Sequence, residues 1–158
     1  MKKIHIFLLF ISISNFAQNN NNFSLENKSI EWSYVFELKP GENISLLKDN
    51  LILDFKNDNF GISKNQTISC GGISIYSRLP FNFNFKIESK EDKYRVVVSN
   101  IIFNDNLNFG NNTTTKLEMY ALKNDSEIKQ NGQNNKNLNC LNEYFLNIFK
   151  IKTPKSNW

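Results

Sequence analysis

Hydrophobic and polar residues alternate in two consecutive runs along the middle of the chain. The apolar positions are Phe81, Phe83, Phe85 and Ile87 in the first run and Tyr94, Val96 and Val98 in the second. A period of two places these side chains on one face of a strand, and the residues between them face the opposite side. Ser89 to Lys93 forms a polar turn between the runs. The pattern therefore predicts an antiparallel hairpin with one buried and one wet face.

Further strands are predicted on both sides of this hairpin. Glu31 to Leu38 carries an apolar residue at every second position, from Trp32 onwards, and ends at Pro40-Gly41. Thr113 to Leu122 fits another strand, exposed on one side. Short β-prone pieces contain Ile62, Ile68, Ile73 and Ile75, with a bulge or turn expected at Gly71-Gly72.

Two segments change to helical spacing. From Asn43 to Asp58 the apolar residues are Ile44, Leu47, Leu51 and Phe55, which predicts a helix of about four turns with Asn43 as N-cap. From Asn137 to Phe149 they are Leu138, Leu141, Phe145 and Ile148. The pattern therefore predicts an α+β fold, a twisted antiparallel sheet of about five strands with two helices packed on one face.

The N-terminal residues differ in character from the rest. Met1 to Ala17 combines two lysines, an apolar run and a small residue, which is typical of a secretory signal peptide. We expect a signal peptide at 1–17, a disordered leader at 18–28, one α+β domain at 29–153 and a tail at 154–158. Lys123 to Asn137 is polar enough to be loose. We expect no membrane span, because no segment is long and apolar enough, and no lipid anchor, because no cysteine lies within a few residues after the apolar run.

Composition excludes several kinds of chemistry. The sole histidine, His5, lies in the predicted signal peptide, so the mature chain has no imidazole for catalysis or metal binding. Removal of Lys2 and Lys3 lowers the formal charge from +4 to +2, which gives little attraction to nucleic acid. The 28 asparagines are interpreted as the mark of an AT-rich genome.

Four groups of residues are candidates for chemical sites. Ser45 and Lys48 match a Ser-x-x-Lys spacing without its partner motifs, and the phenylalanine stripe of the hairpin lacks the signature of an RNA-binding sheet. The possible calcium loop is Asn104, Asp105, Asn106, Asn108 and Gly110, with only one carboxylate. The carboxylates open to glycoside hydrolysis are Asp54, Glu88, Asp92 and Glu143. Since nothing singles out one group, we predict no catalytic, metal-binding or cofactor-binding residue.

The segment Phe81 to Asn100 carries a family resemblance. An alternating apolar strand, a turn of lysines and acids, and Lys93-Tyr94-Arg95 opening the return strand resemble an exported Bacteroidota family of unknown function with a TBP-like fold. The similarity covers about Glu31 to Phe103, and Trp158 after a closing helix also fits. The resemblance implies a twisted antiparallel sheet with helices on one face. It implies no reaction and no cofactor.

We predict a noncatalytic binding or interaction module of the bacterial periplasm or cell exterior, with another envelope or extracellular protein as the expected partner and no nucleic acid. The alternative is a small hydrolase that uses carboxylates. An interaction module should expose an apolar patch on the uncovered sheet face, whereas an enzyme should have a concave pocket with paired acids.

Cys70 and Cys140 are the two cysteines of the chain. An oxidising compartment permits a disulfide between them, and two separately buried thiols are the alternative. We expect the two cysteines to approach each other, because a middle strand and the closing helix should stack across the core, so the pair is a candidate disulfide. Thiol labelling of the oxidised, denatured protein is then expected to find no reactive thiol. Two reactive thiols per chain would rule the bridge out.

Overall fold

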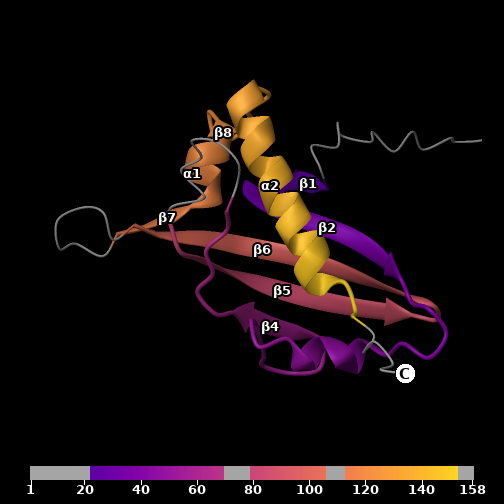
Figure 1. Ribbon diagram of the computed structural model, residues 1–158. Coiled ribbons are helices and arrows are strands. Elements are labelled where there is room, and N and C mark those ends of the chain that lie inside the picture. Colours follow the sequence, from indigo (N-terminus) through magenta and orange to yellow (C-terminus); the bar gives the residue numbers. More distant parts are fainter. Residues whose placement is uncertain (1–21, 70–78, 106–112, 153–158) are drawn as a thin grey trace, which may run out of the picture.

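A seven-stranded antiparallel sheet and one long helix, α2 (Gly132–Phe149), form the two layers of the molecule. The computed structural model describes residues 22–69, 79–105 and 113–152. The strand order is β1-β2-β6-β5-β4-β3, and β7 pairs with β6 outside this path. Figure 1 shows α2 running diagonally across one face of the sheet.

The strands of the large sheet are β1 (Phe23–Glu26), β2 (Ser29–Glu37), β3 (Leu53–Phe55), β4 (Phe60–Ser63), β5 (Phe81–Lys90), β6 (Lys93–Asp105) and β7 (Thr113–Lys116). The smaller elements are the 3₁₀ helix η1 (Ile44–Asp49), the short helix α1 (Leu117–Ala121), and a two-stranded sheet of β8 (Leu122–Lys123) and β9 (Glu127–Ile128). Every strand pair is antiparallel.

The core lies between α2 and the inward face of the sheet. All seven apolar residues that the hairpin pattern selected are buried, and β5 and β6 pair in the predicted hairpin. Rings from the sheet meet rings from the helix: the centroids of Phe83 and Phe145 are 5.1 Å apart, and those of Phe85 and Phe149 are 5.5 Å apart. The predicted closing helix is confirmed and begins earlier, at Gly132.

A β-bulge in β6 keeps its apolar residues on the core side. Asn82 pairs with Ile102 and Asn84 with Ser99, so one residue of β5 faces two residues of β6, Asn100 and Ile101. Asn100 has a φ of 51°, the left-handed conformation common at such bulges. The extra residue shifts the alternation, so that Ile101 and Phe103 are buried like Val98.

The predicted helix over residues 43–58 is wrong. Asn43 does cap a helix, since its side chain accepts from the amide of Ser45, but η1 ends at Asp49 and the chain continues into β3. Asparagine side chains explain the difference. Asn50 accepts from the amide of Ile52, and Asn57 accepts from the amides of Asn59 and Phe60. These local hydrogen bonds favour turns over helix.

The predicted disordered leader is also wrong for its last residues. Phe23–Glu26 form the edge strand β1, paired with β2, and Phe23 is buried against Phe145. The connecting residues Asn27 and Lys28 both have positive φ, as in the tight turns that join two antiparallel strands. Asparagine at such a turn stabilises structure here, although the Asn-rich composition had indicated disorder.

The segment after β7 is more ordered than predicted. Thr113–Lys116 is a strand, but residues 117–121 form α1 instead of continuing it. The segment Lys123 to Asn137, expected to be loose, contains the last residue of β8, all of β9 and the start of α2. Asn131 caps α2 by accepting from the amide of Asn134, and Asn134 Nδ2 donates to the carbonyl of Lys129. Asparagine caps of this kind start a helix in a polar segment.

The α+β class is confirmed, with two differences of detail. The main sheet has seven strands instead of about five, and one long helix with the short η1 replaces the two expected helices. Several predictions lie outside the described residues: the signal peptide at 1–17, the first leader residues, Cys70, the glycine pair with Ile73 and Ile75, most of the Asn104 to Gly110 loop, and the 154–158 tail.

The bulge gives a test of the register. Asn100→Gly is expected to keep the free energy of unfolding within about 0.5 kcal/mol, because glycine adopts the left-handed conformation readily. Asn100→Val is expected to lower it by about 1–2 kcal/mol, because a β-branched residue is strained there. Urea unfolding measures both variants, and equal stability of the two would contradict a left-handed bulge at this position.

Candidate functional site

A cavity of about 570 Å³ lies between the end of α2 and the segment that follows η1. Four of its lining residues from the η1 to β3 segment are apolar: Leu46, Leu47, Leu51 and Ile52. The helix side contributes Tyr144, Asn147, Ile148, Lys150, Ile151 and Lys152. Most of the wall is therefore apolar, with polar groups from the end of α2, from the residues that follow it, and from Asp49 and Asn50.

Two side-chain hydrogen bonds fix the walls of this cavity. Asn50 Nδ2 donates to the carbonyl of Ile148 over 3.0 Å and ties the segment after η1 to the last turn of α2. Tyr94 Oη donates to the carbonyl of Phe149 over 2.7 Å and ties the same turn to the sheet. The last carbonyls of a helix have no partner within the helix, so both bonds satisfy acceptors that need one.

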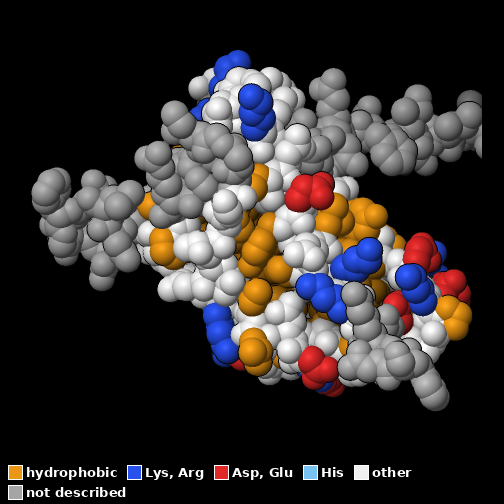
Figure 2. All heavy atoms as spheres, viewed as in Figure 1, with side chains coloured by type: hydrophobic (Ala, Val, Ile, Leu, Met, Phe, Trp, Pro, Cys, Tyr) orange, Lys and Arg blue, Asp and Glu red, His pale blue; other side chains and the backbone are white. Residues whose placement is uncertain are grey.

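The charged residues of the cavity wall are Lys150, Lys152 and Asp49. All three are exposed, and no ion pair joins any of them to another residue in the described part of the chain. Figure 2 shows hydrophobic side chains exposed beside α2 and Lys or Arg side chains where that helix ends. Leu51, also in the wall, is 82% exposed, so its side chain offers apolar surface to a ligand.

Two tyrosines near the end of α2 differ in their hydrogen bonding. Burial raises the pKa of Tyr94 to about 12, and its hydroxyl has the Phe149 carbonyl as acceptor. Burial also raises the pKa of Tyr144, which lines the cavity, but its buried hydroxyl has no hydrogen-bond partner among the residues that the structure describes. Burying a hydroxyl without a hydrogen bond lowers the free energy of unfolding. The Tyr144 hydroxyl therefore does not contribute to the stability of the fold.

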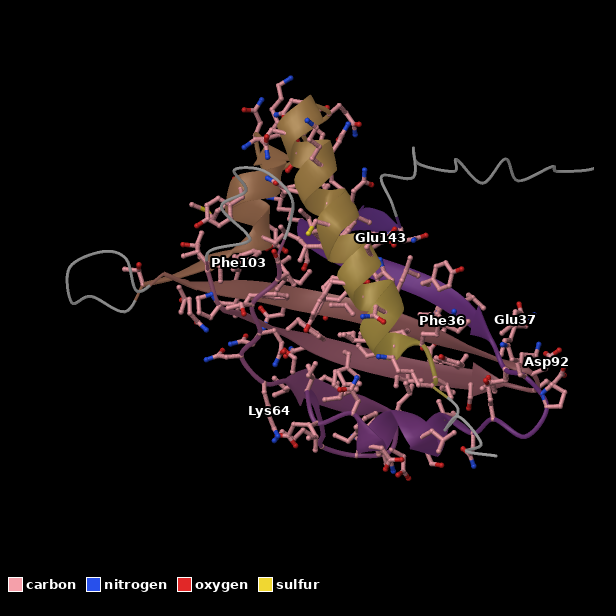
Figure 3. All side chains as sticks on the ribbon, in the orientation of Figure 1. Phe36, Glu37, Lys64, Asp92, Phe103 and Glu143 are labelled. Carbon is pink, nitrogen blue, oxygen red and sulfur yellow. The ribbon has the colours of Figure 1, made fainter. Side chains whose placement is uncertain are left out.

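The carboxylates considered for hydrolysis are not brought together. Asp54 pairs with Lys56, and Glu88 pairs with Lys86 and Arg95; hydrogen bonds from the two cations lower the pKa of Glu88. Figure 3 shows Glu143 on α2 and Asp92 at the far end of the β5–β6 hairpin. Within the described ranges no group of three or more His, Cys, Asp or Glu side chains is placed to hold a metal ion.

The remaining candidates have structural partners. Lys48 forms an ion pair with Asp58 over 2.8 Å, and this hydrogen bond lowers the pKa of the Asp58 carboxyl. Asn104 Nδ2 donates to Asn65 Oδ1 over 2.8 Å, beside β5. Cys140 is half-buried on α2 and packs against the core. Its predicted partner Cys70 lies outside the described residues, so the disulfide stays a prediction.

The face of the sheet opposite α2 is polar with scattered apolar residues. Val35 is 46% exposed and lies beside Arg95, which pairs with Glu88 on the next strand. Ile62, on β4 toward the other edge of the same face, lies beside Asn84 of β5. Because ion pairs and amides separate the apolar side chains, those of the described residues form no continuous patch of the kind expected for an interaction surface.

Sequence reasoning missed the cavity because its residues carry no motif. The sequence pattern predicts Leu47 and Leu51 on the apolar stripe of one helix, yet Leu47 is buried and Leu51 is exposed. Lys150 and Lys152 look like ordinary surface lysines in the sequence. The one available signal was their alternation with Ile151, which is buried.

The architecture, an antiparallel sheet with a long helix across one face, is TBP-like. It is similar to the crystal structure of a TBP-like protein from Parabacteroides distasonis, with a TM-score of 0.52 and 16% identity over 80% of this chain and 91% of that chain. A DUF4468 family protein from Bacteroides ovatus gives a TM-score of 0.46 and 13% identity over 87% of this chain and 99% of that chain. The first comparison confirms the TBP-like fold that the resemblance implied.

Searches with family models and among curated proteins found no match to this chain. Both structural neighbours come from Bacteroidota, but identities this low establish the fold alone. In the described part of the chain, the helices are too short or too polar to cross a bilayer.

The two tyrosines give a contrasting pair of substitutions. Tyr94→Phe is expected to lower the free energy of unfolding by about 1 kcal/mol at neutral pH, because the Phe149 carbonyl loses its donor. Tyr144→Phe is expected to leave stability unchanged or to raise it by up to about 1 kcal/mol, because it removes an unpaired hydroxyl. Urea unfolding measures both. A larger loss for Tyr144→Phe than for Tyr94→Phe would contradict these hydrogen-bond assignments.

The same variants test the direction of the pKa shifts. Since folding raises both pKa values, the unfolded state loses these protons first and the folded state is destabilised above about pH 10. Each phenylalanine variant should therefore lose less stability than the wild type as the pH rises beyond that value.

Proposed function

We propose that this chain is an exported, noncatalytic binding module and that its ligand is a small molecule whose apolar part enters the cavity beside the end of α2. The observation that carries the proposal is an apolar cavity of about 570 Å³ with a leucine, Leu51, 82% exposed in its wall. Cavities of roughly 300–1,000 Å³ with a mainly apolar lining are typical of small-molecule sites. Export rests on the signal-peptide pattern of Met1 to Ala17.

Two features favour binding at this place over the polar face of the sheet. The cavity walls are held by hydrogen bonds from Asn50 and Tyr94, so the site is formed before a ligand arrives, which lowers the entropic cost of binding. A ligand that covers Leu51 also removes apolar surface from water. The hydrolase alternative has no comparable support, because its carboxylates make separate ion pairs or lie far apart.

Titration with the neutral apolar fluorophore N-phenyl-1-naphthylamine tests the proposal. The wild type is expected to bind it saturably, with one site per chain. Asn147→Trp places a large ring at the cavity wall from an exposed helix position, and should abolish most of the binding. Asn139→Trp is the matched control, because Asn139 is an exposed asparagine of the same helix that does not line the cavity.

A second pair of variants tests the exposed leucine. Leu51→Ser is expected to weaken binding about five- to tenfold, since a leucine contact with an apolar ligand is worth about 1–1.5 kcal/mol when only partly buried. Met119→Ser, 74% exposed on α1, should have no effect. The absence of saturable binding, or equal losses in a variant and its control, would overturn the proposal.

A further inference from the structure

We infer that the ligand of this cavity is a single-chain anionic amphiphile, with its hydrocarbon chain in the cavity and its acidic head group at Lys150 and Lys152. The inference rests on the proposed function and adds the class of ligand. It starts from the uneven distribution of chemistry around the cavity, in which the apolar side chains come mainly from the η1 to β3 segment and two cations follow the helix.

The two lysines are arranged to act together. Lys150 has an extended backbone, with φ −75° and ψ 123°, and Ile151, the residue between the lysines, is buried while both lysines are exposed. Side chains two residues apart in extended chain point to the same side. Both lysine side chains therefore leave the chain on the side opposite to Ile151, where one anion can contact both ammonium groups.

Nothing else in the described part of the chain engages these cations. Neither lysine forms a salt bridge there. Lysines after a helix often serve to neutralise the negative end of its dipole, but here the carbonyls of Ile148 and Phe149 already accept hydrogen bonds from Asn50 and Tyr94. The ammonium groups therefore remain available to a ligand.

Charge complementarity selects the head group. The cavity wall carries two cations and one carboxylate, Asp49, so its net charge favours an anion over a cation. A purely polar anion would leave the leucine and isoleucine wall in water, and a purely apolar ligand would leave the lysines unused. A carboxylate on a hydrocarbon chain meets both requirements, and the flexible lysine stems can follow the chain while their charged ends stay in water.

Isothermal titration with three detergents that share a dodecyl chain tests the inference. Dodecanoate is anionic, dodecyl maltoside is neutral and dodecyltrimethylammonium is cationic, and each is used below its micelle concentration at neutral pH and low salt. Dodecanoate is expected to bind at least about tenfold more tightly than the other two, because only its carboxylate forms ion pairs with the two ammonium groups.

Substitution of the lysines assigns the head-group site. The double variant Lys150→Met and Lys152→Met should weaken dodecanoate binding about tenfold and leave maltoside binding unchanged. The control is Lys116→Met with Lys136→Met, which removes the same charge from exposed positions outside the cavity wall. Equal losses in the two double variants would show a general effect of net charge and would overturn the assignment.

The outcomes separate the inference from the proposed function. Equal affinity for the three detergents would overturn the anionic head group and leave cavity binding intact. The absence of binding for all three would overturn both. Flotation with phosphatidylglycerol vesicles distinguishes a soluble amphiphile from a membrane surface. Binding to vesicles that depends on the two lysines, without binding of dodecanoate, would show that the lysines contact a membrane and would overturn the inference.

Discussion

A layer of aromatic rings lies between α2 and the sheet and sets the position of the helix. Its ring contacts include those of Trp32 and Phe83 with Phe145, and that of Phe85 with Phe149. Trp32 is fully buried, its ring lies 5.3 Å from that of Phe145, and its indole nitrogen donates to Asn142 Oδ1 over 2.9 Å. The ring contacts supply apolar burial, which has no direction, whereas the indole bond fixes one rotation and one height of the helix on the sheet. The end of α2, and with it the cavity, takes its position from this layer.

The sheet must keep its apolar residues on the side of this layer over long strands. β6 does so with the bulge at Asn100, and without it Ile101 and Phe103 would face solvent. The pairing of β2 with β6 begins at Trp32 and does not include Ser29 and Ile30 at the start of β2. There, Glu118 Oε1 accepts hydrogen bonds from the amide of Ile30 and from Ser29 Oγ. A carboxylate from α1 thus satisfies backbone that the sheet leaves unpaired.

The sequence was informative where one periodicity dominated and misleading where asparagine decided the local structure. Phe83 and Val96 could be placed in the core because alternation over long strands has one interpretation. Leu51 and Phe55 fitted a helical stripe, but Phe55 also alternates with Asp54 and Lys56, and side-chain bonds from Asn50 and Asn57 decided in favour of turns and a strand. Composition cannot separate an asparagine in a disordered leader from one in a tight turn, as at Asn27.

The wrongly predicted helix and the cavity have the same physical cause. A four-turn helix over residues 43–58 would have laid Leu47 and Leu51 on one continuous apolar face, which would pack along the sheet. Because η1 ends at Asp49, the chain turns at Asn50, whose side chain binds the Ile148 carbonyl and holds the segment against the end of α2. Leu47 remains in the core while Leu51 is left exposed. The side chains of this segment therefore line the cavity beside the end of α2 and do not fill it. The asparagine that ends the helix is thus the residue that builds the site.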